Sequence, residues 1–245
     1  MKSALLAISM VVFTSNVLAN EPAHWSYEGE GSPQNWSKLS PDYMLCEKGK
    51  NQSPINIHKS MKVHARPLHI NYKMPPISLI NNGHSIQANV QEGDFIRLDG
   101  EEFTLQQFHF HSPSENTING KSFPLEAHFV NMDADGEIAV VAVMFEIGKA
   151  NPALTQISRQ LPDDIGETVV LKQKVDIKRL LPESLAHYRY TGSLTTPPCT
   201  EGVRWMVVKQ PLTLSTEQLT WFTSAINHAN NRPLQDLHGR VVLDD

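Results

Sequence analysis

The chain has 245 residues, a formal net charge of −5 and a pI close to 6.1. This length suits one large domain with a sizeable core, because β-rich domains often reach it. The chain contains no run of Lys and Arg, so a nucleic-acid partner is not expected.

The first residues have the pattern of an export signal. Lys2 follows the initial Met, residues 4–13 are apolar, and Val17-Leu18-Ala19 fits a small-residue cleavage site. The apolar run is too short to span a bilayer, and no other segment of the sequence could do so. We therefore expect a signal peptide over residues 1–19, a domain over residues 20–245, a periplasmic or secreted location, and no membrane span.

The two cysteines, Cys46 and Cys199, fit such a compartment. An even number of cysteines in an exported chain favours a disulfide, although two free buried thiols are the alternative. Cys199 directly follows Thr195-Thr196-Pro197-Pro198, so a disulfide would also fix that loop.

Most elements predicted along the chain are strands. Asn81-Asn82-Gly83 and Glu92-Gly93-Asp94 each separate two apolar runs and predict hairpin turns. Residues 138–147 are almost continuously apolar, which suits a strand buried on both faces. Strands are predicted over 78–80, 85–90, 95–98, 106–111, 125–132, 138–147, 188–192 and 203–209.

Two helices are predicted from their N-terminal residues. Asn151 and Pro152 form an N-cap and first-turn pair leading into residues 153–160. Ser215-Thr216-Glu217-Gln218 is a capping box for a helix that extends to about His228. The expected fold is α+β and predominantly β, with one large, mostly antiparallel sheet and short helices at its periphery.

Three histidines lie in two of the predicted strands. His109 and His111 are two residues apart, so they point to one face with their Cα atoms about 6.6–6.8 Å apart. His128 on a paired strand would complete a tripod around one metal ion. Three imidazoles without a fourth protein ligand leave a coordination position for water, as in catalytic zinc sites.

The residues next to these histidines support a metal site. Gln107 and Glu126 each precede a histidine by two positions, so each can accept the second ring N–H and fix the tautomer. Phe108, Phe110 and Phe129 alternate with the histidines and should face the opposite side of the sheet.

Several motifs together resemble an α-class carbonic anhydrase. They run in order from about Trp25 to Arg232, over nearly all of the expected mature chain, and the export signal and cysteine pair fit the bacterial periplasmic branch. The motifs are Asn51-Gln52-Ser53-Pro54-Ile55-Asn56-Ile57, Asn82-Gly83-His84, Gln107-Phe108-His109-Phe110-His111, Ser114-Glu115, Glu126-Ala127-His128 and Ser193-Leu194-Thr195-Thr196-Pro197-Pro198.

This resemblance implies a fold and a reaction. The fold would be a single domain with a central twisted, mostly antiparallel sheet of about ten strands and a conical cleft. Zn²⁺, held by His109, His111 and His128 at the base of the cleft, would carry the hydroxide that attacks carbon dioxide. The products of this reversible hydration would be bicarbonate and a proton.

The resemblance also implies roles for other residues. Thr195 corresponds to the hydroxyl that accepts a hydrogen bond from the hydroxide, and Glu115 to the acid that receives the Thr195 proton in turn. His84 corresponds to the shuttle that carries the released proton to buffer, and Thr196 to a cleft-edge residue that bonds bicarbonate or water. The implied wall of the carbon dioxide pocket is Val130, Val140, Leu194 and Trp205, and the implied water path is Tyr27, Asn82 and Gln87.

Other expectations follow from the same resemblance. The Ser53-Pro54 and Pro197-Pro198 bonds would be cis. Sulfonamides and small anions would inhibit the enzyme. Dimers are common among bacterial members of the class, so a homodimer is one alternative for the oligomeric state.

Two rival interpretations differ in function. His109-x-His111-x-x-x-Glu115 also resembles the first metal motif of the cupins, in which the Glu binds iron or manganese. Gly120 lies too close to Glu115 for that motif, and no Pro-x-Gly-x-x-His motif follows. The second rival is a non-catalytic binding module with an anhydrase fold, but such relatives usually lack one of the three histidines.

Overall fold

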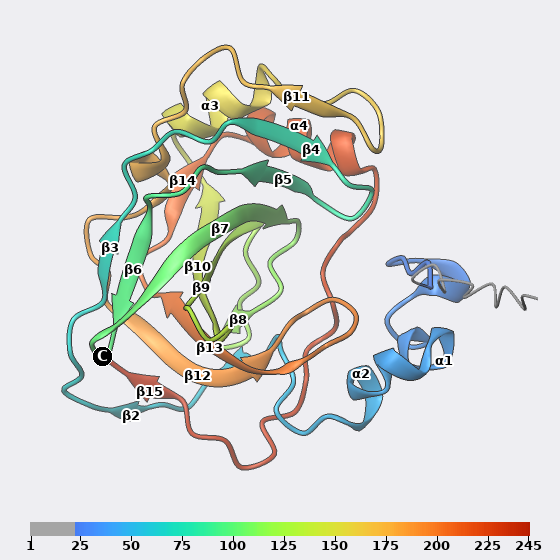
Figure 1. Cartoon of the computed structure of the whole chain (residues 1–245), viewed down its shortest axis with the longest axis vertical. Coiled ribbons are helices and arrows are strands. Elements are labelled where there is room, and N and C mark those ends of the chain that lie inside the picture. Colours follow the sequence, from blue (N-terminus) through green and yellow to red (C-terminus); the bar gives the residue numbers. More distant parts are fainter. Residues whose placement is uncertain (1–22) are drawn as a thin grey trace, which may run out of the picture.

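Thirteen strands form one mixed sheet in the computed structural model, which describes residues 23–245 (Figure 1). The order across the sheet is β11-β4-β5-β7-β9-β10-β13-β12-β15-β2; β6 also pairs with β7, β3 with β6, and β14 with β10. The β10–β13, β10–β14 and β15–β2 pairs are parallel, and the other pairs in this sheet are antiparallel. The predicted predominantly β, mostly antiparallel fold is therefore confirmed.

All eight predicted strands are present, and three of them agree with the prediction at both ends. Strand β7 begins five residues before its predicted start, and the short strands β1, β2, β3, β8, β11, β14 and β15 were not predicted. A separate two-stranded sheet pairs β1 with β8. The strands are β1 (Asn56–Ile57), β2 (Met61–Lys62), β3 (His69–Asn71), β4 (Ser78–Asn81), β5 (Ile86–Asn89), β6 (Phe95–Leu98), β7 (Glu101–His111), β8 (Thr117–Ile118), β9 (Leu125–Met132), β10 (Ile138–Ile147), β11 (Thr168–Val170), β12 (His187–Ser193), β13 (Glu201–Val208), β14 (Leu212–Leu214) and β15 (Leu243–Asp244).

One predicted hairpin is wrong. Strands β4 and β5 are joined at Asn82-Gly83 and pair as expected, with Gly83 at φ 82° in the turn. Strands β5 and β6 do not pair with each other across residues 92–94. Both instead pair with the long strand β7, at opposite ends of it, because its 11 residues offer an edge to each.

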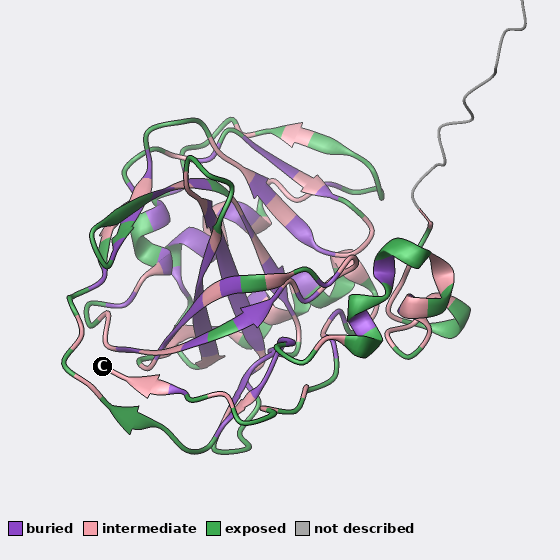
Figure 2. Ribbon diagram, turned by 60° about the horizontal axis from the view of Figure 1, so that its bottom comes forward, coloured by how far each residue is buried: buried purple, intermediate pink, exposed green. Residues whose placement is uncertain are grey.

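Apolar residues cover both faces of the central strands. On β10, Val141 and Val143 belong to the main core, whereas Val140 and Ala142 belong to a second apolar cluster on the other face. Figure 2 shows these central strands as the most continuously buried part of the ribbon. The prediction of a strand buried on both faces is confirmed for β10, of which seven consecutive residues are buried.

The two predicted helices are present and their caps are connected. Asn151 caps α3 (Pro152–Ser158) by accepting from the Ala153 and Leu154 amides, and Ser215 with Gln218 forms the capping box of α4 (Thr216–Ile226). Gln218 also donates to the Asn151 carbonyl (2.7 Å) and accepts from its amide (2.9 Å). Each helix ends two residues before its predicted end, and α4 stops at Asn227, which has a φ of 61°.

Shorter helical segments lie mainly in the N-terminal region. They are η1 (Gly29–Gly31), α1 (Trp36–Leu39), η2 (Pro41–Tyr43), α2 (Leu45–Lys48) and η3 (Ile177–Leu180). No helix within residues 23–245 is long and apolar enough to cross a membrane. The predicted signal peptide lies outside the described residues.

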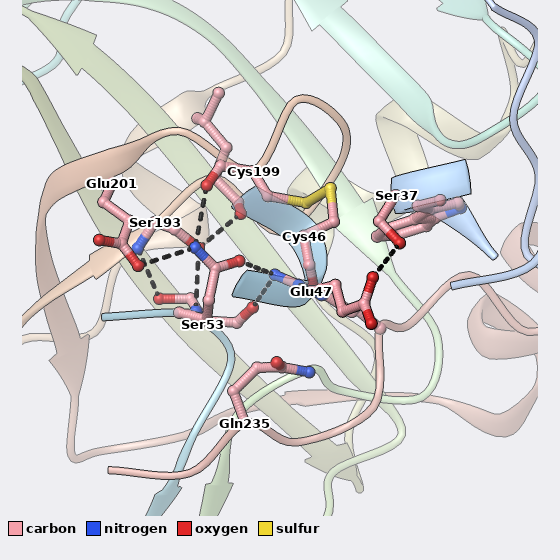
Figure 3. Close-up of a disulfide and its surroundings, with 12 residues drawn as sticks. Ser37, Cys46, Glu47, Ser53, Ser193, Cys199, Glu201 and Gln235 are labelled. Atoms are coloured by element: carbon pink, nitrogen blue, oxygen red, sulfur yellow. Dashed lines mark hydrogen bonds between the residues drawn. A yellow bond between two sulfur atoms is a disulfide. The ribbon is translucent and has the colours of Figure 1, made fainter. Parts of the chain in front are cut away.

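The predicted disulfide connects the N-terminal segment to the loop between β12 and β13. Cys46 on α2 is bonded to Cys199, with 5.1 Å between their Cα atoms (Figure 3). Next to it, the Ser193 hydroxyl accepts from the Ser53 amide (2.9 Å) and Gln52 Nε2 donates to the Cys199 carbonyl (3.0 Å). The loop that contains Thr195 is therefore fixed covalently and by hydrogen bonds to a segment about 150 residues away in the sequence.

Three proline bonds are cis. Ser53-Pro54 and Pro197-Pro198 are cis as predicted. Ser112-Pro113, directly after His111, is also cis and was not predicted.

Candidate metal centre

The three histidines converge because β7 and β9 pair in a register that sets His109 opposite His128. His109 and His111 share a face of β7, and one nitrogen from each of the three rings lies within 4.8 Å of the others. The ring centroids of His111 and His128 are 4.6 Å apart, and those of His109 and His111 are 5.0 Å apart. The residues described contain no other such cluster of potential metal ligands.

A different group contacts the outer nitrogen of each ring. Gln107 Oε1 lies 2.8 Å from His109 Nδ1, and the Asn230 carbonyl lies 2.7 Å from His111 Nδ1. Glu126 Oε1 lies 2.9 Å from His128 Nε2, although this contact does not meet hydrogen-bond geometry. The predicted hydrogen bond is present for Gln107, whereas Glu126 lies beside His128 as predicted but outside hydrogen-bond geometry. Partners of this kind direct the other ring nitrogen toward a common centre.

Burial keeps these imidazoles neutral. Burial, together with the neighbouring histidines, holds the pKa of His109 and His128 well below the ordinary value, and burial also lowers that of His111. A neutral imidazole has a free lone pair for a metal, whereas a protonated one has none. The donor set of three neutral nitrogens therefore fits zinc.

Polar atoms without partners surround this centre. His111 Nε2, Glu115 Oε2 and Tyr27 Oη are buried and have no hydrogen-bond partner among the described residues. Glu115 Oε2 lies 3.6 Å from His111 Nε2 and 3.9 Å from His128 Nδ1. Buried polar atoms left unpaired are costly, so their grouping around the three histidines fits a position that could hold a metal ion.

Glu115 is held rigidly beside the histidines. Its Oε1 accepts from the Arg232 amide (2.9 Å), and its own amide donates to Glu126 Oε2 (2.6 Å). Burial raises the pKa of Glu115 to about 8, while the Arg232 amide and the Thr195 hydroxyl act to lower it.

A cavity of about 130 Å³ leads to the histidines. It brings together most of the residues predicted for the cleft and the water path. His84 is part of its lining, and the His84 ring is stacked on Trp25 with 3.7 Å between centroids. The cavity is lined by Trp25, Tyr27, Asn82, His84, Ser85, Gln87, Gln107, His109, His111 and Thr196.

The predicted apolar wall lies on the same sheet face as His128. Val140 is in register with Val130 on one side and with Trp205 on the other. The Trp205 ring lies 4.9 Å from that of His128, and its Nε1 donates to the Ser193 carbonyl (3.1 Å). Leu194 packs against the same cluster.

Comparisons with known proteins identify the family of this chain. The family model of the eukaryotic-type carbonic anhydrases matches residues 31–245. A carbonic anhydrase of Pectobacterium carotovorum is 50% identical over 243 residues, covering 99% of this chain and 100% of that protein. The chain belongs to the α-class carbonic anhydrases.

Solved structures of similar proteins have the same fold. The α-carbonic anhydrase of Thermovibrio ammonificans, in complex with the inhibitor sulfanilamide, superposes with a TM-score of 0.89 at 45% identity, over 91% of this chain and all of that one. Dioscorin complexed with ascorbate superposes with a TM-score of 0.85 at 33% identity, over 90% of this chain and 97% of that one. The cupin interpretation is therefore wrong.

Sequence reasoning missed two residues that hold this carbonic anhydrase site together. Asn230 and Arg232 lie in the segment after α4, which has no regular secondary structure and no recognisable metal motif. Arg232 is buried, and its guanidinium donates to Gln52 Oε1, the Ser53 carbonyl and the Cys46 carbonyl, each at 2.8 Å. No local pattern marks Arg232, because the residues around it, Asn230, Asn231, Gln235 and Asp236, are themselves polar.

Replacing Gln107 tests the orientation of His109. Gln107→Ala removes the acceptor of the Nδ1 proton, so zinc affinity should fall about 10–100-fold, the usual effect of losing such a partner. Competition with a chromophoric chelator measures this change. Gln106→Ala is the matched control, because the exposed Gln106 side chain bonds only the Thr104 carbonyl. Equal zinc affinity in both variants would contradict the orienting role.

Proposed function

We propose that this protein is a zinc-dependent enzyme that reversibly hydrates carbon dioxide to bicarbonate and a proton. The observation that carries the proposal is the convergence of three neutral imidazoles beside the buried carboxyl of Glu115. His109, His111 and His128 would hold zinc, which when bound lowers the pKa of a water molecule. Membership of the carbonic anhydrases supports this reaction.

We assign Thr195 and Glu115 the task of orienting the attacking oxygen. The Thr195 hydroxyl would accept a hydrogen bond from that oxygen and donate its own to Glu115, so that a lone pair of the oxygen points toward the substrate carbon. The partnerless Oε2 of Glu115 and the buried hydroxyl of Thr195 support this assignment. Thr196, at the cavity wall, would bond bicarbonate or water.

A stopped-flow assay of carbon dioxide hydration tests this function. The purified protein should show hydration that a sulfonamide abolishes, since a similar enzyme binds sulfanilamide. Chelation should remove the activity and one equivalent of Zn²⁺ should restore it. A protein that binds zinc but shows no sulfonamide-sensitive hydration would be a binding module with an anhydrase fold.

We propose that His84 carries protons between the cavity and buffer. It lines the same cavity as His109 and His111, and so do Tyr27, Asn82 and Gln87, which would order water there. Partial burial lowers the pKa of His84 below its ordinary value, and the nearby His24 and His228 lower it further. His84 would therefore be neutral at pH 7 and able to accept a proton.

His84→Ala should lower turnover in weak buffer by at least about tenfold. A positioned proton-transfer group typically raises a rate by about 10²–10⁴-fold, so this is a conservative expectation. Added imidazole should restore part of it. In the unmodified enzyme, turnover for hydration should rise as pH increases through the His84 pKa, with a midpoint below 6.5, because the neutral ring is the acceptor. His69→Ala is the control, because His69 is an exposed residue at the start of β3. Unchanged turnover in the His84 variant would remove His84 from the reaction.

We propose that carbon dioxide binds against the apolar wall of Val130, Val140, Leu194 and Trp205. The substrate is small and uncharged. Val130, Val140 and Trp205 lie on the sheet face that carries His128, and Leu194 packs against them. Val140→Phe should fill this space and lower kcat/KM at least about tenfold while zinc content stays the same. Val170→Phe, at an exposed position of β11, is the control. If kcat/KM survives at Val140, the substrate binds elsewhere.

We infer that the protein is exported. The Cys46–Cys199 disulfide supports this, because such bonds persist in oxidising compartments. Protein recovered from a Gram-negative host should lie in the periplasm, begin near Asn20 and carry an intact disulfide by mass spectrometry. A cytoplasmic protein that retains residues 1–19 would contradict export.

A homodimer stays a prediction that sedimentation equilibrium would test.

A further inference from the structure

The buried side chain of Asn230 makes three hydrogen bonds that connect the His84 loop to the strand end that carries His111. Its Nδ2 donates to the His84 carbonyl and to the Phe110 carbonyl, both at 2.9 Å. Its Oδ1 accepts from the Ser112 amide at 2.7 Å. The two amide protons and the amide oxygen of the Asn230 side chain are thus all used. The opposite orientation of the amide would place its oxygen against two carbonyl oxygens, so only this orientation satisfies the contacts.

The main chain of Asn230 reinforces the same connection. Its carbonyl accepts the Nδ1 proton of His111, and its amide contacts the Ser112 carbonyl at 3.3 Å. Phe110 and Ser112 flank His111, so Asn230 contacts the β7 terminus before, at and after this histidine. A single residue therefore links the candidate zinc ligand to the main chain of the candidate proton shuttle.

Asn230 is one of two side chains that connect the His84 loop to Phe110 within residues 23–245. The other is Ser85, whose hydroxyl donates to the Phe110 carbonyl at 2.7 Å. Asn82 Oδ1 accepts from the amides of His84 and Ser85, which shapes the loop but does not connect it to β7. Asn230 is the only one of these side chains that bonds the carbonyl of His84 itself.

We propose that Asn230 is a positioning residue for proton transfer, setting the distance between the His84 ring and the histidine cluster. This inference rests on the proposed function, in which His84 is the shuttle. Proton export follows bicarbonate release, so it affects kcat in weak buffer and leaves kcat/KM largely unchanged. Proton transfer through ordered water depends steeply on geometry, so a displaced His84 loop slows this step first.

Asn230→Ala should lower kcat in weak buffer by about tenfold, change kcat/KM far less, and recover kcat on addition of imidazole. The double variant with His84→Ala should be no slower than His84→Ala alone, because both changes act on one route. In metal-free protein, the NMR signals of the His84 ring should shift in Asn230→Ala.

Asn131→Ala is the matched control. Asn131 is also fully buried and makes three side-chain hydrogen bonds, accepting from Tyr72 Oη and donating to the Phe129 and Ala139 carbonyls. Its amide lies in the core, away from His84, so its loss should lower stability while kcat of the folded, zinc-loaded protein stays the same.

Asn230→Asp provides a second variant of nearly the same size. Its carboxylate can still accept from the Ser112 amide but cannot donate to the two carbonyls. We therefore again expect kcat in weak buffer to fall while kcat/KM changes far less.

The inference is overturned if kcat and kcat/KM fall together, if imidazole does not restore kcat, or if the Asn230 variants fail to fold where Asn131→Ala folds. If His84→Ala loses turnover and Asn230→Ala does not, this inference alone fails. If His84→Ala keeps full turnover, the proposed shuttle fails as well.

Discussion

A β-bulge in β7 determines which side chains reach the metal centre. The register between β7 and β9 shifts between Leu105 and Gln107, so the residues that face the main core change from Phe103 and Leu105 to Phe108 and Phe110. One extra residue reverses the alternation of a strand. Without this bulge, either the first or the second half of β7 would turn its apolar side chains away from the core. With it, His109 and His111 face the cavity.

Buried hydrogen bonds then fix the site from several distant segments. Glu126 contacts His128 and also accepts the amides of Glu115 and Asn116, so one carboxylate positions a candidate ligand and the turn that carries Glu115. Arg232 connects that turn to the Cys46 segment through its amide and guanidinium. A hydrogen-bond network in which nearly all buried polar groups have partners holds a single geometry. Among the described residues, the buried side-chain atoms without a partner lie at the histidine cluster and in the cavity that leads to it, except for His187 Nε2.

The sequence predicted the local elements and the ligand set because both depend on short periodic patterns. The alternation of Phe108, His109, Phe110 and His111 specifies a strand with a polar and an apolar face. The first and last residues of β9 and β10 were both predicted correctly. The β5–β6 hairpin was wrong because the choice of partner strand depends on β7, which no local pattern describes. Asn230 and Arg232 were missed for a related reason, since their partners lie more than 100 residues away.

X-ray absorption spectroscopy of the purified protein tests the central claim most directly, that three histidines bind zinc and leave one position for a non-protein ligand. The account predicts one zinc per chain, with three imidazole nitrogens at about 2.0–2.1 Å and one further light atom that a sulfonamide replaces. A carboxylate oxygen of Glu115 in the coordination shell, or fewer than three imidazoles, would contradict it.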